Sequence, residues 1–345
     1  MERFFEGFDL WSIADPTCLS LKEWEYIGIS AFNSTYFSLD SGQFSGKCLT
    51  KGIYEGNSEG FIRKVDSHPH HIIGFDINLR FTATATRQIF SSYNGSAKFL
   101  QVSIDTSGQL IFSLNGSVIY THSSVLSLNN WYYVEVEHLV SSSSGTINIW
   151  IDNTLAFNLS GDTKGSATNT FISAYEIFNT TGGAARVSFD NMYYLESNGS
   201  TARLGSILIE TFIPRATYSE SGWTYTGAFT AYDALDGLLL SNGPTALTST
   251  INSEFKLDFS KSLSSNPNII HDVLVRLQVE TVDVGVTNLS VTVKADDDIW
   301  RYSAPLQVSK SGGTYYSFSV PKNPNGNVDW KISEIEYADF GLKVV

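Results

Sequence analysis

The stretch that decides the fold runs Trp131-Tyr-Tyr-Val-Glu-Val-Glu137, then a polar turn ending at Gly145, then Thr146-Ile-Asn-Ile-Trp-Ile-Asp152. Apolar and polar residues alternate in both segments, which is typical of half-buried β-strands. We expect one apolar face on this hairpin, formed by Trp131, Tyr133, Ile147, Ile149 and Ile151, with Glu135 and Glu137 facing away from it. Such a face needs a second sheet to cover it, so the sequence predicts a β-sandwich.

The same alternation extends to both sides of this hairpin, for example in Phe99–Asp105 and Gln109–Leu114. Turn sequences such as Asn115-Gly116 and Asn129-Asn130 separate the segments at short intervals. From Ile72 to Tyr194 we therefore expect roughly eight to ten antiparallel strands and hardly any helix, as in a sandwich or jelly roll.

The chain has 345 residues, a length that fits two domains. Apolar periodicity is lost between Glu196 and Gly205, where small polar residues gather as in a linker. We place the boundary near residue 200, with a jelly roll over 1–198 and a second β-sandwich, for attachment or packing, over 199–345. We expect strands at the start of the second series, Ile207–Phe212, and at its end, Ile332–Tyr337 and Phe340–Val345. The predicted fold class is all-β, with two antiparallel sandwiches in tandem.

The formal net charge is −13 with only 22 Lys and Arg, which argues against nucleic-acid binding because that depends on clustered cations. The N-terminal stretch carries Glu2, Arg3, Glu6 and Asp9 where a signal peptide would need an apolar run. No segment approaches the ~20 apolar residues of a membrane span. We expect synthesis in a cytoplasm and no membrane insertion.

Three segments taken together resemble the laminin-G-like, concanavalin A-like jelly-roll family. They are the Trp131 strand, the strand ending at Asp152-Asn153, and Val187-Ser-Phe-Asp-Asn-Met-Tyr-Tyr-Leu195. The resemblance covers about residues 1–198, including Phe5-Glu-Gly-Phe-Asp9. It departs from the family at Asp152-Asn153, where the turn more often carries Gly, although Asn also tolerates positive φ.

The C-terminal half is similar to the second domain of structural proteins of tailed bacteriophages. Leu204-Gly205, the segment from Pro214 to Trp223, and the segment from Trp330 to Lys343 carry this similarity. It implies a virion protein, made in the host cytoplasm, that decorates a capsid, neck or tail and contacts other virion proteins. It also implies a homo-oligomer, with a trimer favoured.

No catalytic residue is expected, so the chain is predicted not to be an enzyme. Glycoside hydrolases with this fold carry paired carboxylates two positions apart on one strand. The nearest spacings here are Glu135/Glu137 and Glu334/Glu336, and both are interpreted as solvated strand faces. No cofactor-binding motif is present.

No metal ligand is assigned either. His68-Pro69-His70-His71 has imidazoles that can bind transition metals, but Pro69 places the cluster in an exposed turn before the Ile72 strand. Asp296-Asp-Asp298 is interpreted as an acidic hairpin turn rather than a Ca²⁺ site. Cys18 and Cys48 are two buried hydrophobes or a disulfide, and the sequence leaves both open.

Aromatic side chains in polar, irregular contexts are candidates for stacking on sugars. These are Trp11, Trp24, Tyr26, Tyr36 and Tyr93. The leading hypothesis is a bacteriophage virion structural protein that acts through protein–protein contacts and host-surface adhesion. The alternatives are a carbohydrate-binding lectin module that recognises host glycans, and a glycan depolymerase.

Overall fold

The computed structural model describes residues 3–7, 24–27, 37–43, 47–51, 59–81, 83–180, 186–197, 202–210, 212, 214–226, 245–247, 252–259, 269–279, 287–295, 299–308 and 314–345. The chain divides into two compact units, Met1–Glu210 and Thr211–Val345. The first unit therefore extends past residue 198, where the sequence placed the end of the first domain.

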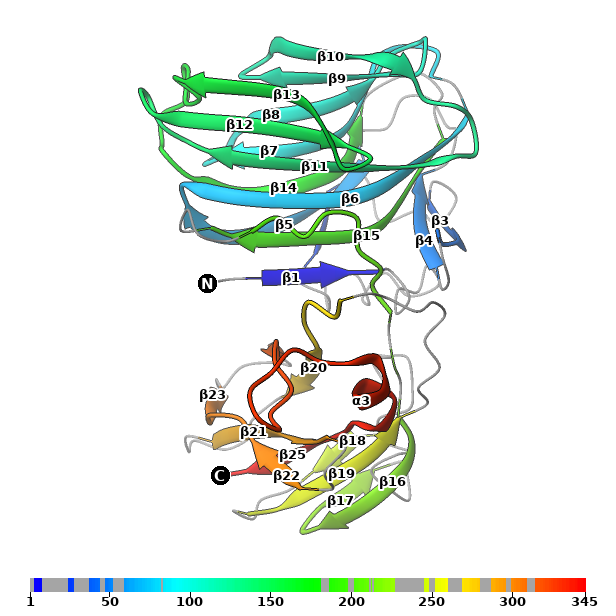
Figure 1. The fold of residues 1–345 in the computed structure, drawn as a ribbon, viewed down its shortest axis with the longest axis vertical. Helices are drawn as coiled ribbons and strands as arrows, with labels where there is room; N and C mark the ends of the chain where they lie inside the picture. Colours follow the sequence, from blue (N-terminus) through cyan, green and yellow to red (C-terminus); the bar gives the residue numbers. More distant parts are fainter. Residues whose placement is uncertain are drawn as a thin grey trace. The chain divides into compact units, whose positions relative to one another are not determined.

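The first unit is a sandwich of two antiparallel sheets, here called sheet A and sheet B (Figure 1). Sheet A contains, in spatial order, β13 (Thr154–Gly161), β12 (Gly145–Ile151), β11 (Trp131–Leu139), β6 (His70–Phe81), β15 (Arg186–Glu196), β4 (Lys47–Lys51) and β3 (Phe37–Ser41), with β1 (Arg3–Glu6) also paired to β15. Sheet B contains β10 (Ser117–Val125), β9 (Gln109–Leu114), β8 (Ala97–Ile104), β7 (Arg87–Asn94), β14 (Ile172–Thr180), β5 (Glu59–His68) and β2 (Glu25–Ile27). The all-β prediction is confirmed.

Aromatic side chains from the inner faces of the two sheets form the core of the sandwich. Phe75 of sheet A and Phe90 of sheet B have ring centroids 5.1 Å apart. Phe189 meets Phe178 edge to face at 4.9 Å. These rings are almost fully buried, and burying one such side chain contributes about 1.5–3 kcal/mol relative to leaving it exposed. The core therefore holds the sheets face to face and leaves their outer faces for other contacts.

The predicted core face of the Trp131 hairpin is right for β12, where Ile147, Ile149 and Ile151 are buried in the core, and wrong for β11. In the pairing of β11 with β12, Val134 lies opposite Ile151 and Val136 opposite Ile149, so the core face of β11 is the one that carries these valines. Tyr133 shares the other face with Glu135, because the two are separated by two positions on one strand. That outer face is also buried, with Tyr133 and Glu135 almost inaccessible.

A segment of the chain after β15 covers this outer face of sheet A. Leu204 and Ile207 pack on a cluster formed by Ile72, Tyr133, Tyr193 and Leu195. The backbone N–H of Ile209 donates to Asn191 Oδ1 at 2.9 Å. Residues 207–210, which the sequence predicted to open the second β series, form no strand. Their apolar side chains instead complete the first unit.

The second unit is built around one antiparallel sheet, here called sheet C, with smaller strand pairs. Sheet C contains β16 (Pro214–Ser221), β19 (Glu254–Phe259), β25 (Asp339–Val344), β21 (Thr287–Lys294) and β22 (Trp300–Tyr302), with β23 (Leu306–Val308) also paired to β21. The smaller pairs are β17 (Thr224–Thr226) with β18 (Thr245–Leu247), and β20 (Leu274–Val279) with β24 (Thr314–Ser319).

The segment predicted as a strand over Ile332–Tyr337 is a short helix, α3 (Ile332–Tyr337). The Glu334 carboxylate accepts a hydrogen bond from the Lys331 backbone N–H at 2.8 Å, which caps the first turn. Ile335 and Ala338, three positions apart, are buried beside Trp330 in the core of the second unit. Tertiary packing of this face favours the helix over the strand. Among the described residues, no helix is long and apolar enough to span a membrane.

Candidate functional site

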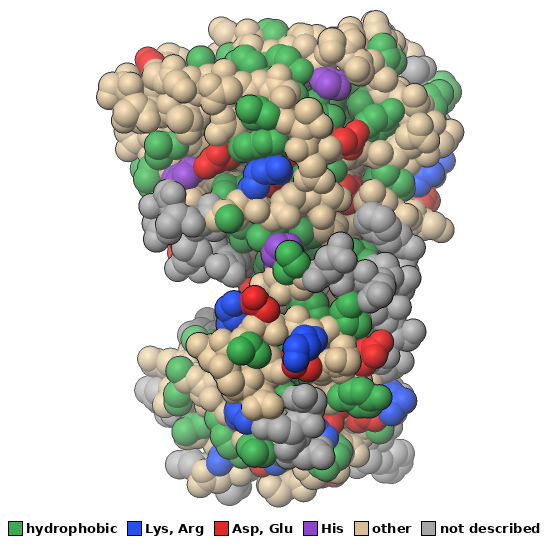
Figure 2. All heavy atoms as spheres, viewed as in Figure 1, with side chains coloured by type: hydrophobic (Ala, Val, Ile, Leu, Met, Phe, Trp, Pro, Cys, Tyr) green, Lys and Arg blue, Asp and Glu red, His purple; other side chains and the backbone are tan. Residues whose placement is uncertain are grey.

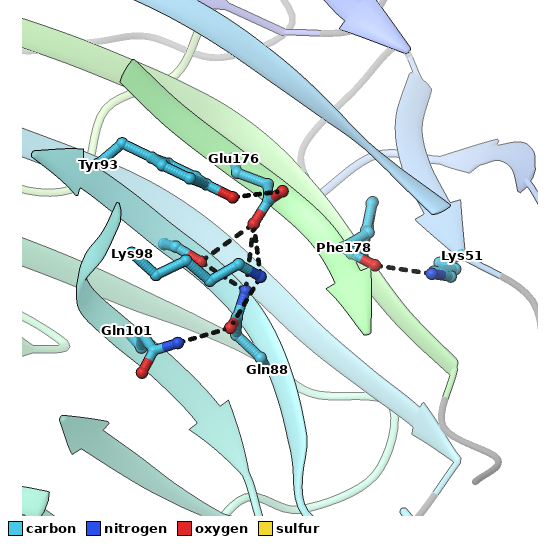
Figure 3. A network of polar contacts seen from close by, with 8 residues as sticks. Lys51, Gln88, Tyr93, Lys98, Gln101, Glu176 and Phe178 are labelled. Carbon is cyan, nitrogen blue, oxygen red and sulfur yellow. Dashed lines mark hydrogen bonds and ion pairs between the residues drawn. The ribbon is translucent and has the colours of Figure 1, made fainter. Parts of the chain in front are cut away.

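A polar network on the outer face of sheet B is centred on Glu176 of β14 (Figure 3). In the strand register Glu176 lies opposite Ser91 of β7 and Ile62 of β5, while the neighbouring Ile177 and Tyr175 turn into the core. The Glu176 side chain is fully buried, although it is on the outer face. Other side chains of that face must therefore cover it.

Hydroxyl and ammonium donors surround the Glu176 carboxylate. The Tyr93 hydroxyl donates to Oε1 at 2.9 Å, the Lys98 Nζ lies 2.9 Å from Oε2, and the Ser91 hydroxyl donates to Oε2 at 3.2 Å. A buried charge is tolerated only when it is paired and hydrogen-bonded, and this carboxylate meets that condition. Glu176 thus fixes the positions of Tyr93 and Lys98 and does not itself reach solvent.

Two glutamines extend the network along the face. The Gln88 amide donates to Glu176 Oε2 at 3.3 Å, and its carbonyl oxygen accepts from Gln101 at 2.8 Å and from Lys98 at 3.2 Å. Gln88 therefore bridges the carboxylate and two neighbours, as Figure 3 shows. The result is a rigid row of hydroxyl, amide and ammonium groups whose outer atoms face away from the core.

Strand register aligns a second cation with this network. Ala174 of β14 lies opposite Lys64 of β5 on one side and opposite Tyr93 of β7 on the other, and Tyr93 lies opposite Lys98 of β8. Lys64, Tyr93 and Lys98 therefore form one row across four strands. Lys64 is exposed, whereas Tyr93 and Lys98 are half-buried.

Tyr93 is held in its neutral form. Burial, together with the nearby Glu176 charge and the hydrogen bond to it, raises the pKa of the Tyr93 hydroxyl far above its ordinary value. At neutral pH the group is therefore a hydrogen-bond and proton donor. A glycoside hydrolase would need two accessible carboxylates, whereas the described part of this network holds one, and it is buried.

The five aromatic candidates have different outcomes. Trp24 is a core residue with no exposed surface, so it is not available to a sugar. Tyr93 lies on a strand rather than in an irregular segment, and it belongs to the network around Glu176. Tyr26 is placed on β2, opposite Phe61. Trp11 and Tyr36 lie outside the described residues. The other members of the network were missed by the sequence reading.

The histidine cluster does not form a metal site. His68 ends β5 and His70 begins β6, so only Pro69 forms the turn, and the predicted exposed loop is wrong. His70 contacts Glu137 at 2.9 Å on the outer face of sheet A, whereas His71 points into the core between the rings of Tyr175 and Tyr194. Within the described residues, no group of three potential ligands could hold a metal ion.

The other acidic residues and the cysteines considered from the sequence have the following places in the structure. Glu135 is buried and paired with Arg203, and Glu137 is bonded to His70, so the pair is not a solvated strand face. Glu334 is buried at the start of α3, whereas Glu336 is exposed. Cys48 is a buried free thiol. Cys18 and Asp296–Asp298 lie outside the described residues.

Comparison with known proteins adds similarity of fold only. No family model matches the chain, and no curated protein matches it either. Among solved structures, the alginate lyase Aly36B aligns with a TM-score of 0.43 and 11% identity, covering 56% of this chain and 96% of that one. The cellulose-induced protein Cip1 aligns at 0.39 and 13%, covering 56% and 97%. The alginate lyase AlgAT5, of polysaccharide lyase family 7, aligns at 0.40 and 9%, covering 52% and 97%.

These similarities bear on two expectations. The predicted absence of enzymatic activity is contradicted, because the solved structures similar to this chain include alginate lyases. The β-sandwich part of the predicted resemblance is supported, while none of these three structures is named as a bacteriophage protein. At 9–13% identity the likeness assigns no activity to this chain.

Proposed function

We propose that the first unit binds a carbohydrate chain across the outer face of sheet B. The observation that carries this proposal is the network in which buried Glu176 orients Tyr93, Lys98 and Gln88. Sugar-binding sites place a few fixed polar groups beside a ring that can stack on a pyranose. Groups that are held in place before binding lose little conformational entropy when the ligand arrives.

The charges of the row favour an acidic sugar. Lys64 and Lys98 lie on one line across the strands, and the carboxylate closest to Lys98 is buried below it. The net charge of −13 for the whole chain would repel a polyanion elsewhere. Figure 2 shows small mixed groups of charged side chains rather than a continuous basic patch on the face drawn there. Two lysines on a polar sheet face suit uronic-acid residues better than nucleic acid.

Affinity electrophoresis in gels containing alginate, polygalacturonate or dextran tests this proposal. We expect the two acidic polysaccharides to retard the protein and dextran to have less effect. Lys98→Met and Gln101→Ala should weaken the retardation about tenfold each, since each removes one polar contact to the ligand. Lys322→Met is the matched control, because it removes the same charge from the second unit. Unchanged retardation of Lys98→Met would contradict the proposal.

A second candidate function is cleavage of the bound chain by elimination. The specific observation is the direct hydrogen bond from the Tyr93 hydroxyl to Glu176. In this reaction the Tyr93 oxygen would take the proton α to the uronate carboxylate while its own proton passes to Glu176. The same oxygen would then give a proton to the departing glycosidic oxygen, and Glu176 would return the proton to Tyr93. Lys98 would stabilise the negative charge that develops on the uronate.

Formation of the unsaturated product separates binding from cleavage. Elimination creates a double bond conjugated with the carboxylate, which absorbs ultraviolet light, and incubation with alginate or polygalacturonate would show it. Tyr93→Phe should abolish this signal and retain most of the affinity, because the ring remains. A signal that persists in Tyr93→Phe would exclude the proposed proton transfer, and no signal with any acidic polysaccharide would leave a binding module.

The virion setting expected from the sequence stays a prediction, as do the homo-oligomer, its trimeric state and its contacts with other virion proteins. Carbohydrate binding is compatible with that setting, since adhesion to a host surface needs a glycan-binding face. Imaging of particles that carry this chain would test the setting.

A further inference from the structure

The outer face of sheet C, in the second unit, presents exposed aromatic rings. Strand register separates its two sides: Val291 and Val293 of β21 lie opposite Leu342 and Phe340 of β25 and turn to the core. The alternate positions form the outer face, and they include Thr292, Lys294, Asp339 and Gly341.

Three aromatic side chains stand on this face. Trp300 lies opposite Lys294 and Tyr302 lies opposite Thr292, so both rings of β22 are on the outer side. Tyr218 of β16 meets Trp300 with ring centroids 5.9 Å apart. Tyr218 is 57% exposed and Tyr302 is 50% exposed. We call these three rings, with the lysines that contact them, the sheet C platform.

Lysine side chains support the rings. Lys294 Nζ lies 4.6 Å from the centroid of Tyr218, Lys256 Nζ lies 4.7 Å from that of Trp300, and Lys343 Nζ lies 4.9 Å from that of Tyr302. These are cation–π distances. Two of the lysines are also fixed by carboxylates, Lys294 by Asp339 at 2.8 Å and Lys256 by Glu254 at 3.1 Å. The rings are therefore held in one orientation before any partner arrives.

Gly341 of β25 lies between Lys256 and Thr292 in the sheet and has no room for a side chain. A Cβ atom on Gly341 would lie 2.2 Å from the Phe255 carbonyl oxygen and 2.7 Å from Thr292 Oγ1. Only glycine fits there, and Gly341 and Thr292 are both buried, so the strands of sheet C pack tightly beneath the rings. The rings of Tyr218 and Tyr302, and not the strands below them, are therefore the surface that a ligand can reach.

We infer that the sheet C platform is a second carbohydrate-binding site and that its ligand is a neutral glycan. Rigid exposed rings suit the apolar face of a pyranose, and the half-buried Lys256 and Glu254 beside them offer a donor and an acceptor for its hydroxyls. The cores of protein–protein interfaces are depleted in Lys, Glu and Asp, whereas these rings rise from such residues. Two of the platform's three lysines, Lys256 and Lys294, are paired with Glu254 and Asp339, which favours an uncharged chain over a polyanion.

Isothermal titration calorimetry and affinity electrophoresis of the full chain test this inference, with galactomannan, hydroxyethylcellulose and dextran as neutral probes. We expect at least one probe to bind, and Trp300→Ala or Tyr218→Ala to weaken that binding about tenfold. Tyr218→Phe should retain it because the ring face is kept. Tyr337→Ala is the matched control, since Tyr337 is an exposed aromatic on α3, which packs against the opposite side of sheet C.

The Lys98→Met variant separates this site from the proposed site on sheet B. It should leave binding of the neutral probe unchanged, so failure of one site does not entail failure of the other. Absence of binding to every neutral probe would overturn the inference. Sedimentation velocity tests the alternative that a second copy of the chain binds the platform. If Tyr218→Ala dissociates an oligomer and leaves glycan binding unchanged, the platform is a contact between copies of the chain.

Discussion

Nη1 of Arg203 lies 2.6 Å from Oε2 of Glu135, a carboxylate that is fully buried on the outer face of sheet A. Tyr193 donates its hydroxyl to the other carboxylate oxygen at 2.6 Å, and the guanidinium lies over the Trp150 ring at 4.7 Å. The segment after β15 is thereby fastened to the sandwich at a charged residue and not only at the apolar Leu204 and Ile207. This explains why the first unit continues to Glu210.

Arg203→Met should destabilise the first unit by about 3 kcal/mol, because it leaves the Glu135 charge buried with the Tyr193 hydroxyl as its main remaining donor. Urea unfolding of the full chain measures this loss. The double variant Glu135→Gln/Arg203→Met should recover most of it, since no buried charge remains. Equal losses in the single and double variants would show that the ion pair is not the source.

Gly74→Ala should also destabilise the first unit, by about 2–3 kcal/mol. An added Cβ would lie 2.3 Å from Cε1 of Tyr193 and 2.7 Å from the Tyr133 hydroxyl oxygen, and these two hydroxyls are hydrogen-bonded at 2.9 Å. Both rings are buried and have no room to move. In a chain that also carries Tyr193→Leu, Gly74→Ala should lower the free energy of unfolding by clearly less. An equal cost in both backgrounds would assign the effect to the backbone of β6.

The strands were predictable where one face is buried and the other is open. Leu110, Phe112 and Leu114 alternate with half-buried polar or smaller side chains, and β9 is where this alternation places it. The faces of β11 were not predictable, because the segment around Arg203 buries the second face as well. In Ile332–Tyr337 only Ile335 and Tyr337 have the spacing of a strand, and contacts of Ile335 with Trp330 and the core favour the helix.

The candidate site was predicted only at Tyr93. Glu176 is 83 residues away from it in the chain, and their contact depends on the pairing of β14 with β7, which no local pattern specifies. One signal was present in the sequence: Lys98, Gln101 and Ser103 are the polar positions of a strand whose other side chains are apolar. Gln101 and Ser103 mark an outer face by their spacing of two, whereas Lys98 joins that face only through the register shift between β7 and β8, which the sequence does not reveal.

Two buried histidines should make the first unit sensitive to acid. Burial lowers the pKa of His71 to about 3 and that of His138 to about 4, against an ordinary value of 6.5. The unfolded chain therefore binds protons that the folded chain does not, and stability is lost as pH falls from about 6.5 toward these values. Each histidine should contribute roughly 1 kcal/mol per pH unit between pH 6 and 4.

Urea unfolding at several pH values tests this sensitivity. His71→Phe should lower the number of protons taken up on unfolding by about one, because the unfolded chain then has one group fewer to protonate. The slope of the free energy of unfolding against pH should fall accordingly. Phe99→Leu is the control, since it weakens the core beside His138 without removing a titrating group, and it should shift the curve without changing its slope. An unchanged slope in His71→Phe would mean that this histidine is already protonated in the folded chain.

Asp76 and Asp190 form a buried pair on the outer face of sheet A. They lie directly opposite each other in the pairing of β6 with β15. Asp190 accepts backbone N–H bonds from Gln43 at 2.7 Å and Asn191 at 2.8 Å, whereas Asp76 accepts from the Asn191 side chain at 2.9 Å. Burial, and then the nearby Asp190 charge, raise the pKa of Asp76 well above its ordinary value. Its contribution to stability is present in acid and is lost as pH rises through this raised pKa.

Asp76→Asn should therefore stabilise the first unit at pH 8, by about 1–2 kcal/mol, because the amide removes a charge that burial and Asp190 both disfavour. The gain should shrink toward pH 4, where the wild-type carboxyl is already protonated, and urea unfolding at both pH values measures it. Asp190→Asn is the matched control: it loses charge-assisted bonds from two backbone donors, so it should not stabilise at either pH. A loss of stability in Asp76→Asn at pH 8 would show that the folded chain requires the ionised carboxylate.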